Sequence, residues 1–306
     1  MISVVVPTYK SAQTLPALFE RLTKVLSEIS TAHEVIFVDD CSNDGTWEVL
    51  EKLARETDFV RAYLLSRNFG QHNALLCGLR EARGSLVVTM DDDLQHPPEE
   101  LPKLLGALTE DYDVVYGTPK LQQHGLFRNL ASKITKISLQ GSIGVKNAQS
   151  VSAYRVFRSK LRDAFSEYRN STVSIDVLLA WSTDKFTAVD VVHEPRRIGK
   201  SGYTMRKLLR HTLNMLTGFS TLPLRIASLI GFCFSLFGVG VLSYVIVGWF
   251  IYGSAVQGFV FLASVIAIFS GAQLLATGII GEYLARMYTR MLGQPAYIVR
   301  KKISSS

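Results

Sequence analysis

Two long stretches without a charged residue limit what the second half of this chain can fold into. Residues 226–253 and 259–281 contain no Asp, Glu, Lys or Arg. Each exceeds the roughly 20 residues that cross the hydrocarbon core of a bilayer, and a buried core helix is rarely uncharged on every side over that length. The sequence therefore predicts a transmembrane hairpin, in which the short connection at 254–258 makes the two helices antiparallel neighbours.

Basic residues around the hairpin predict its orientation. Lys and Arg precede the first span at 206, 207, 210 and 225 and follow the second at 286, 290, 300, 301 and 302, whereas the connecting loop has none. By the positive-inside rule, both termini are then cytoplasmic. Residues 1–7 lack the basic region, apolar region and cleavage site of a signal peptide, and we expect none.

Charge and cysteine usage narrow the class of partner. The chain has 306 residues and a net charge of +7, but many basic residues lie within 196–210, directly before the first span. Anionic lipid headgroups are a simpler partner for such a cluster than nucleic acid. Cys41, Cys77 and Cys233 are widely spaced and form no paired motif, which fits a reducing compartment without disulfide or metal-binding cysteines.

The first 120 residues alternate between short apolar runs and helical periodicity. Strands are predicted at 2–6, 34–38, 60–65, 85–90 and 113–116, and helices at 15–29, 45–56, 71–83 and 99–109. Repeated βα units of this kind predict an α/β fold with a mostly parallel sheet and helices on both faces. We divide the chain into a cytoplasmic catalytic domain (1–204), a juxtamembrane amphipathic helix (205–221), the transmembrane hairpin (222–290) and a cytoplasmic tail (291–306). A further amphipathic segment at 125–144 is either an ordinary core helix or an interfacial helix on the membrane.

Three consecutive aspartates follow the fourth predicted strand. In an extended backbone alternate residues share a side, so Asp91, Asp93 and Gln95 present three oxygen ligands together. Mg²⁺ and Mn²⁺ accept such carboxylate and amide oxygens. The alternative is a solvated acidic loop, but open α/β sheets bind their ligands at the carboxyl ends of strands, which favours a metal site here.

Two other strand ends add groups suited to a nucleotide. The first strand leads to Pro7 and Tyr9, whose ring can stack on a base, and the second leads to Asp39, which can accept hydrogen bonds from a base or ribose. Asp39 equally suits a helix cap. The chain has no glycine-rich phosphate loop, which disfavours the common dinucleotide and P-loop enzymes. If the ligand is a nucleoside diphosphate, a metal ion and basic side chains must then neutralise the negative charge of its diphosphate.

These segments strongly resemble the polyprenyl-phosphate glycosyltransferases of glycosyltransferase family 2. The resemblance extends to Arg67–His72, to Asp91–Pro98 and to Gly281-Glu282-Tyr283 with Arg286. That group includes dolichyl-phosphate mannose synthases, bactoprenol glucosyltransferases and undecaprenyl-phosphate aminoarabinose transferases. The resemblance covers nearly the whole chain. It implies a GT-A type nucleotide-binding domain and metal-dependent, inverting transfer from a nucleoside-diphosphate sugar, with a UDP-sugar favoured, to a polyprenyl phosphate such as undecaprenyl phosphate. It also implies a multi-pass protein of the bacterial inner membrane and a homo-oligomer, such as a tetramer.

The resemblance assigns roles residue by residue. It implies Asp91, Asp93 and Gln95 as metal ligands, and as catalytic residues Asp91, Asp93, Arg128 and Arg196. The nucleotide-sugar site comprises Pro7, Tyr9, Asp39, Arg67, Asp91 and Asp92. The acceptor phosphate is implied to meet Arg128, Ser132, Arg196 and Ser201. Arg128 and Arg196 have an alternative role as simple contacts to lipid headgroups.

Three departures from the family pattern bear on mechanism. Lys10-Ser11 replaces the usual Asn-Glu, Gly202 replaces the common Lys of the basic loop, and residues 147–150 lack the carboxylate proposed as a base before Tyr154-Arg155. A lipid monophosphate, with a second pKa of about 6, is already largely a dianion and needs no base, whereas a sugar hydroxyl needs one. The sequence therefore favours a phosphate acceptor. A processive polysaccharide synthase and a non-catalytic membrane scaffold on the same fold remain the alternatives.

Overall fold

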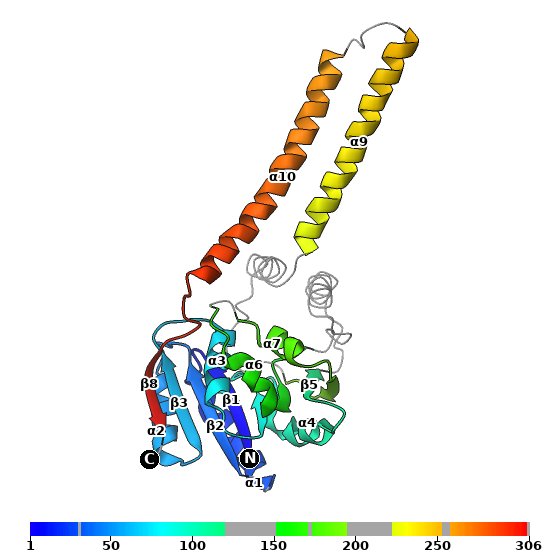
Figure 1. Ribbon diagram of the computed structural model, residues 1–306. Helices are drawn as coiled ribbons and strands as arrows, with labels where there is room; N and C mark the ends of the chain where they lie inside the picture. The colour runs from blue at the N-terminus through cyan, green and yellow to red at the C-terminus, as the bar shows by residue number, and fades with distance from the viewer. Residues whose placement is uncertain (30–31, 120–150, 171–172, 195–221, 253–257, 305–306) are drawn as a thin grey trace. The chain divides into compact units, whose positions relative to one another are not determined.

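The computed structural model describes residues 1–29, 32–119, 151–170, 173–194, 222–252 and 258–304 (Figure 1). The chain divides into two compact units, Met1–Leu208 with Gly293–Ser306, and Leu209–Leu292. The predicted helices at 125–144 and 205–221 lie outside the described residues.

The first unit contains all of the elements predicted for its first 119 residues. Its first strands are β1 (Ile2–Thr8), β2 (His33–Asp39), β3 (Val60–Leu65), β4 (Leu86–Thr89) and β5 (Val114–Pro119). The intervening helices are α1 (Leu15–Glu28), α2 (Thr46–Glu56), α3 (Gln71–Glu81) and α4 (Leu101–Ala107), the last preceded by the 3₁₀ turn η1 (Pro98–Glu100). The α/β class and the βα alternation are thus confirmed.

One mixed sheet of eight strands forms the centre of this unit, in the order β7-β5-β6-β4-β1-β2-β3-β8 (Figure 1). Strands β1 to β4 are mutually parallel where they pair. Strand β6 (Arg155–Arg158) runs antiparallel between β4 and β5, and β7 (Phe186–Val191) pairs with β5 in parallel. The parallel arrangement is therefore confirmed for the strands that lead into the predicted site, while the remainder of the sheet is mixed.

The C-terminal segment joins this sheet, although sequence analysis assigns residues 291–306 to a tail. Strand β8 (Val299–Ser304) pairs antiparallel with β3 at the sheet edge. Arg300, Lys301 and Lys302 interrupt any apolar alternation in this segment, and charged side chains are what an edge strand tolerates. The pairing comes from the exposed edge of β3, a feature that the local sequence does not encode.

Alternation along the strands divides the core between the two faces of the sheet. Val4 and Val6 of β1 are buried in a cluster with α1, α2 and α4, whereas Val5 is buried with α3 on the opposite face. The second face is completed by the helices α6 (Asp163–Ser166) and α7 (Ile175–Ser182), which follow the turn η3 (Ser159–Arg162). Gly78 of α3 lies so close to β1 that an added Cβ would meet the Val5 side chain at 2.4 Å.

The second unit is a pair of long helices, α9 (Leu222–Tyr252) and α10 (Phe259–Met291), which lie side by side (Figure 1). Both are long and apolar enough to cross a membrane, over Ile226–Ile251 with mean hydropathy 2.2 and over Ile268–Met291 with 1.2. Phe269 of α10 packs against Phe234 and Phe237 of α9, with ring centroids 5.6 and 6.3 Å apart. The predicted two-helix hairpin is confirmed as a pair of apolar helices.

Candidate active site

The loops after β1, β2, β3 and β4 surround a pocket of about 360 Å³ at the carboxyl ends of the strands. Its lining residues are Pro7, Thr8, Tyr9, Asp40, Asn68, Gly70, Gln71, Asp91, Asp92 and Asp93. The structure thus brings together Pro7, Tyr9 and all three consecutive aspartates. Parallel strands place their carboxyl ends at one edge of the sheet, which is why residues so distant in sequence meet there.

Asp92 ties the loop after β1 to the loop after β4. One carboxylate oxygen, Oδ2, accepts the backbone N–H of Tyr9 at 3.1 Å and the hydroxyl of Ser11. Burial raises the pKa of Asp92 to about 6, against which these hydrogen bonds act. Asp92 therefore supplies a carboxylate beside Ser11, the position at which the family pattern has Glu.

Asp91 and Asp93 contribute the hard oxygen donors that a divalent cation requires. Asp91 Oδ1 accepts a hydrogen bond from Gln71 Nε2 at 2.6 Å, and Asp93 Oδ1 accepts the backbone N–H of Gln95 at 3.1 Å. Both line the pocket, so the two carboxylates fit the predicted metal. Gln95 does not line it, and its amide Nε2 lies 3.5 Å from His193 Nε2. Among the described residues, no three His, Cys, Asp or Glu side chains form a metal-binding group.

Asp39 and Asp40 have different surroundings. Asp39 Oδ1 accepts the backbone N–H and the hydroxyl of Ser42, while its buried Oδ2 has no hydrogen-bond partner within the described part of the chain. Asp39 does not cap α2, whose N-cap is Gly45 without a side-chain cap hydrogen bond, and Asp44 Oδ1 accepts the N–H of Thr46, the first residue of the helix. Burial raises the pKa of Asp39. Asp39 is fully buried and does not line the pocket, so the structure does not place this predicted nucleotide residue with Pro7 and Tyr9.

Asp40, which sequence analysis does not single out, fixes the loop after β3. Its two carboxylate oxygens accept the backbone N–H groups of Phe69 and Gly70 at 2.7 and 2.8 Å. Gly70 has φ +97°, a conformation that favours glycine, and it leads into α3. Asp40 also lines the pocket beside Asn68 and Gln71. Its position directly after Asp39 at a strand end was the available signal.

Of the predicted nucleotide residues Tyr9 and Arg67, only Tyr9 lines the pocket. The Arg67 guanidinium stacks on Phe69, 4.7 Å from the ring centroid, and Arg67 is absent from the pocket lining. Tyr9 lines the pocket with 47% of its surface exposed, and the Lys10 ammonium lies 5.4 Å from its ring centroid. The ring of Tyr9 is therefore accessible for stacking.

Backbone strain gathers around the pocket. Within the described ranges, the non-glycine residues with positive φ are Lys10 (57°), Cys41 (60°) and Leu94 (60°). They lie in the loops after β1, β2 and β4. Residues with a Cβ adopt this conformation only where the surroundings hold them, and such positions cluster at ligand sites.

The predicted acceptor-phosphate residues, Arg128, Ser132, Arg196 and Ser201, lie outside the described residues. The same holds for Gly202 and for residues 147–150, which bear on the missing base. His193 and Glu194, directly before this basic segment, are described.

Comparison with known proteins gives matches over the whole chain. A model of "Glycosyl transferase family 2" matches residues 3–168. An undecaprenyl-phosphate 4-deoxy-4-formamido-L-arabinose transferase from Pectobacterium atrosepticum is 36% identical, with 100% of this chain and 94% of the relative covered. The transferase of the same name from Proteus mirabilis is 34% identical, over 99% of this chain and 94% of its own.

Among solved structures, glucosyl-3-phosphoglycerate synthase from Mycobacterium tuberculosis in complex with UDP matches with a TM-score of 0.50 and 18% identity. The match covers 71% of this chain and 79% of that one. A likeness at this level shows the fold alone, and it agrees with the GT-A type fold expected from the sequence.

Proposed function

We propose that this chain, a glycosyltransferase that belongs to glycosyl transferase family 2, transfers a sugar from a nucleoside-diphosphate sugar to a polyprenyl phosphate at the cytoplasmic face of the bacterial inner membrane. The proposal rests on the full-length likeness to transferases whose names specify undecaprenyl phosphate, in a chain that has two long apolar helices. Undecaprenyl phosphate is thus the first acceptor to test.

The pocket supports a nucleotide-sugar donor. The exposed ring of Tyr9 lines the pocket and can stack on a base. Asp39 does not line the pocket, and its role as an acceptor for a base or ribose requires that its buried, unsatisfied Oδ2 become accessible when the nucleotide binds. We favour a UDP-sugar. Because the relatives' names specify 4-deoxy-4-formamido-L-arabinose, the UDP derivative of that sugar is the first donor to test.

Asp91 and Asp93 would hold Mg²⁺ or Mn²⁺, and Gln95 would join them if its amide turned away from His193. When bound, the cation would neutralise charge on the departing nucleoside diphosphate. Hydrogen bonds within the chain fix the residues that would contact the donor. Asp92 fixes the loop of Tyr9, and Asp40 fixes the loop that carries Asn68 and Gly70. Gln71 orients the carboxylate of Asp91.

The acceptor phosphate attacks the anomeric carbon directly, with inversion. A phosphate monoester is largely dianionic at neutral pH and needs no protein base for this step, which fits the absence of a carboxylate at 147–150. Arg128, Ser132, Arg196 and Ser201 are proposed to hold this phosphate and reduce its repulsion from the donor. Two membrane spans would anchor the catalytic unit at the membrane that contains the lipid phosphate. The proposed active form is a homo-oligomer.

The test is a donor panel assayed with the full-length protein in nanodiscs, with undecaprenyl phosphate and Mg²⁺ or Mn²⁺. We expect labelled sugar in an organic-soluble, mild-acid-labile product. An ethanol-insoluble polymer would support a processive polysaccharide synthase instead. Nucleotide binding without turnover on any donor would support a non-catalytic scaffold.

A further inference from the structure

A guanidinium on the first helix bridges two acidic side chains that are distant in sequence. Arg21 of α1 donates from Nε to Glu99 Oε1 at 2.9 Å and from Nη2 to Glu99 Oε2 at 2.7 Å. The same Nη2 donates to Glu194 Oε1 at 2.8 Å. Glu99 belongs to η1 and Glu194 follows β7, so one side chain joins three parts of the fold.

The bridged residues lead to the aspartates of the pocket. The backbone N–H of Glu194 donates to the carbonyl oxygen of Gln95 at 2.9 Å. The N–H of Gln95 in turn donates to Asp93 Oδ1 at 3.1 Å. Arg21 is therefore connected to the Asp93 carboxylate through Glu194 and Gln95.

The backbone between Asp93 and Gln95 needs such support. Leu94 has φ 60°, which a residue with a Cβ adopts only when its surroundings hold it there. Its side chain is 4% exposed and belongs to the hydrophobic core, which fixes one side of the turn. The contacts at Gln95 and Glu99 fix the chain that follows.

We propose that Arg21 is a positioning residue, which holds residues 93–95 in the conformation that presents Asp93 to the pocket by bridging Glu99 and Glu194. The inference rests on the proposed function, in which Asp93 is a metal ligand. The paired hydrogen bonds of a guanidinium to a carboxylate fix orientation as well as distance, which a lysine cannot reproduce.

The test compares Arg21→Gln, Arg21→Lys and Glu194→Gln in the full-length protein. We expect Arg21→Gln to lower kcat by about 10- to 100-fold, as is typical when a group that orients a metal ligand is lost. The Mn²⁺ concentration for half-maximal activity should rise, while UDP binding without metal stays unchanged. Arg21→Lys should lie between wild type and Arg21→Gln, and Arg21→Gln with Glu194→Gln should be no worse than Arg21→Gln alone.

The matched control is Arg55→Gln, which breaks an exposed ion pair with Glu51 on α2 and should leave activity and metal requirement unchanged. The proposal is overturned if the Arg21 variants only lower the melting temperature, with kcat and metal requirement per folded molecule as in wild type. Mn²⁺ affinity in the presence of UDP, measured by electron paramagnetic resonance, separates the two proposals. Weaker Mn²⁺ binding in Arg21→Gln supports the positioning role even if lipid phosphate proves to be the wrong acceptor, and unchanged binding contradicts it.

Discussion

At the scale of single residues, the three consecutive aspartates have different roles because their carboxylates have different hydrogen-bond partners. Asp92 points back to the loop after β1 and bonds Tyr9 and Ser11, while Asp91 and Asp93 are oriented by Gln71 and Gln95. A run of identical side chains thus supplies both a structural contact and two groups for a ligand. Only the outer two match the alternation expected of metal ligands.

Replacement of Asp93 by Asn tests the metal assignment. Asp93→Asn keeps the size of the side chain but removes its charge, so sugar transfer should fall by about 100-fold or more because charge on the leaving diphosphate is no longer offset. The measurement is turnover per molecule in nanodiscs at saturating donor, with Asp111→Asn, an exposed acid outside the pocket, as control. Full activity of Asp93→Asn would remove Asp93 from the metal site.

The strained turn after β2 predicts a stabilising substitution. Cys41 has φ 60°, a conformation in which its Cβ is too close to the backbone. A glycine there has no Cβ and avoids this repulsion, although the greater conformational entropy of the unfolded chain offsets part of the gain in stability. We expect Cys41→Gly to raise the free energy of unfolding by about 0.5–1 kcal/mol. The measurement is thermal unfolding in detergent. Cys41→Ala, which keeps the Cβ, is the matched control, and equal melting temperatures for the two variants would contradict the strain.

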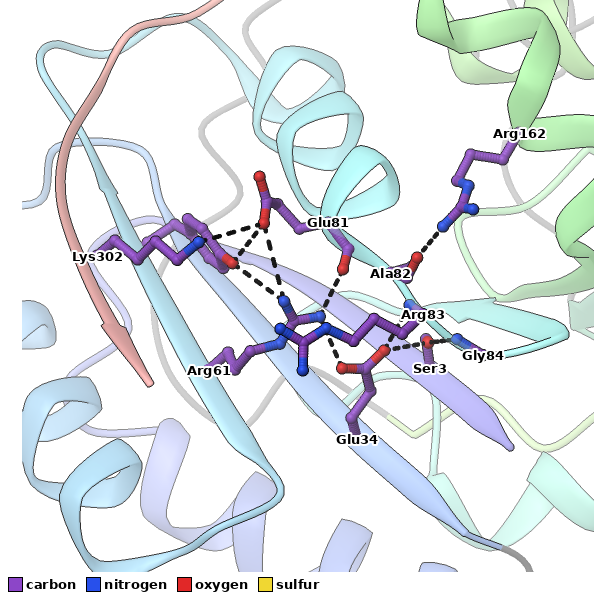
Figure 2. A network of polar contacts seen from close by, with 10 residues as sticks. Ser3, Glu34, Arg61, Glu81, Ala82, Arg83, Gly84, Arg162 and Lys302 are labelled. Carbon is purple, nitrogen blue, oxygen red and sulfur yellow. Dashed lines mark hydrogen bonds and ion pairs between the residues drawn. The ribbon is translucent and has the colours of Figure 1, made fainter. Parts of the chain in front are cut away.

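At the scale of elements, a buried ion pair joins the amino-terminal ends of the strands, opposite the pocket (Figure 2). Glu34 of β2 accepts hydrogen bonds from Arg61 Nη2 of β3, from the Ser3 hydroxyl of β1 and from the backbone N–H of Arg83, each at 2.6 Å. Lys302 of β8 meets Glu81 of α3 at 3.6 Å in the same network. The C-terminal strand is thereby fastened to the strands that carry the site.

Loss of the carboxylate from this network should destabilise the catalytic unit strongly. The side chains of Glu34 and Arg61 are each 6% exposed, so Glu34→Ala removes the nearer carboxylate from a buried guanidinium, leaves it with Glu81 Oε2 at 3.8 Å, and should cost about 3–5 kcal/mol. Glu51→Ala, which removes the partner of Arg55 on the surface of α2, should change stability by about 1 kcal/mol or less. The measurement is thermal unfolding of both variants. Equal decreases in the free energy of unfolding would show that the buried pair contributes no more to stability than the surface pair.

At the scale of the whole molecule, one chain leaves the catalytic unit, forms the hairpin and returns to the same sheet. Met1–Leu208 and Gly293–Ser306 belong to one unit, in which β8 pairs with β3, and Leu209–Leu292 form the other. Both ends of the hairpin are thus attached to the unit that holds the pocket. If both helices cross the membrane, this connectivity puts both ends of the hairpin on the same side of it, and the cytoplasmic location of that side stays a prediction from the flanking basic residues.

Cysteine labelling in intact cells tests that orientation. In a variant without Cys41, Cys77 and Cys233, Ser254→Cys in the connecting loop should react with a membrane-impermeant maleimide from outside the inner membrane. Ser305→Cys should react only after the cells are permeabilised. The reverse pattern would place the catalytic unit on the wrong side for the proposed reaction.

The sequence by itself determined the βα alternation of the first 119 residues, the two apolar helices and the acidic strand ends, because periodicity and hydrophobicity are local properties of a chain. Only the tertiary structure decided that β6 separates β4 from β5, that β8 completes the sheet, that Asp40 rather than Asp39 lines the pocket, and that Arg21 meets Glu99 and Glu194. Each of these depends on pairing between segments far apart along the chain. Such pairing follows from the packing of the whole sheet, which no local pattern records.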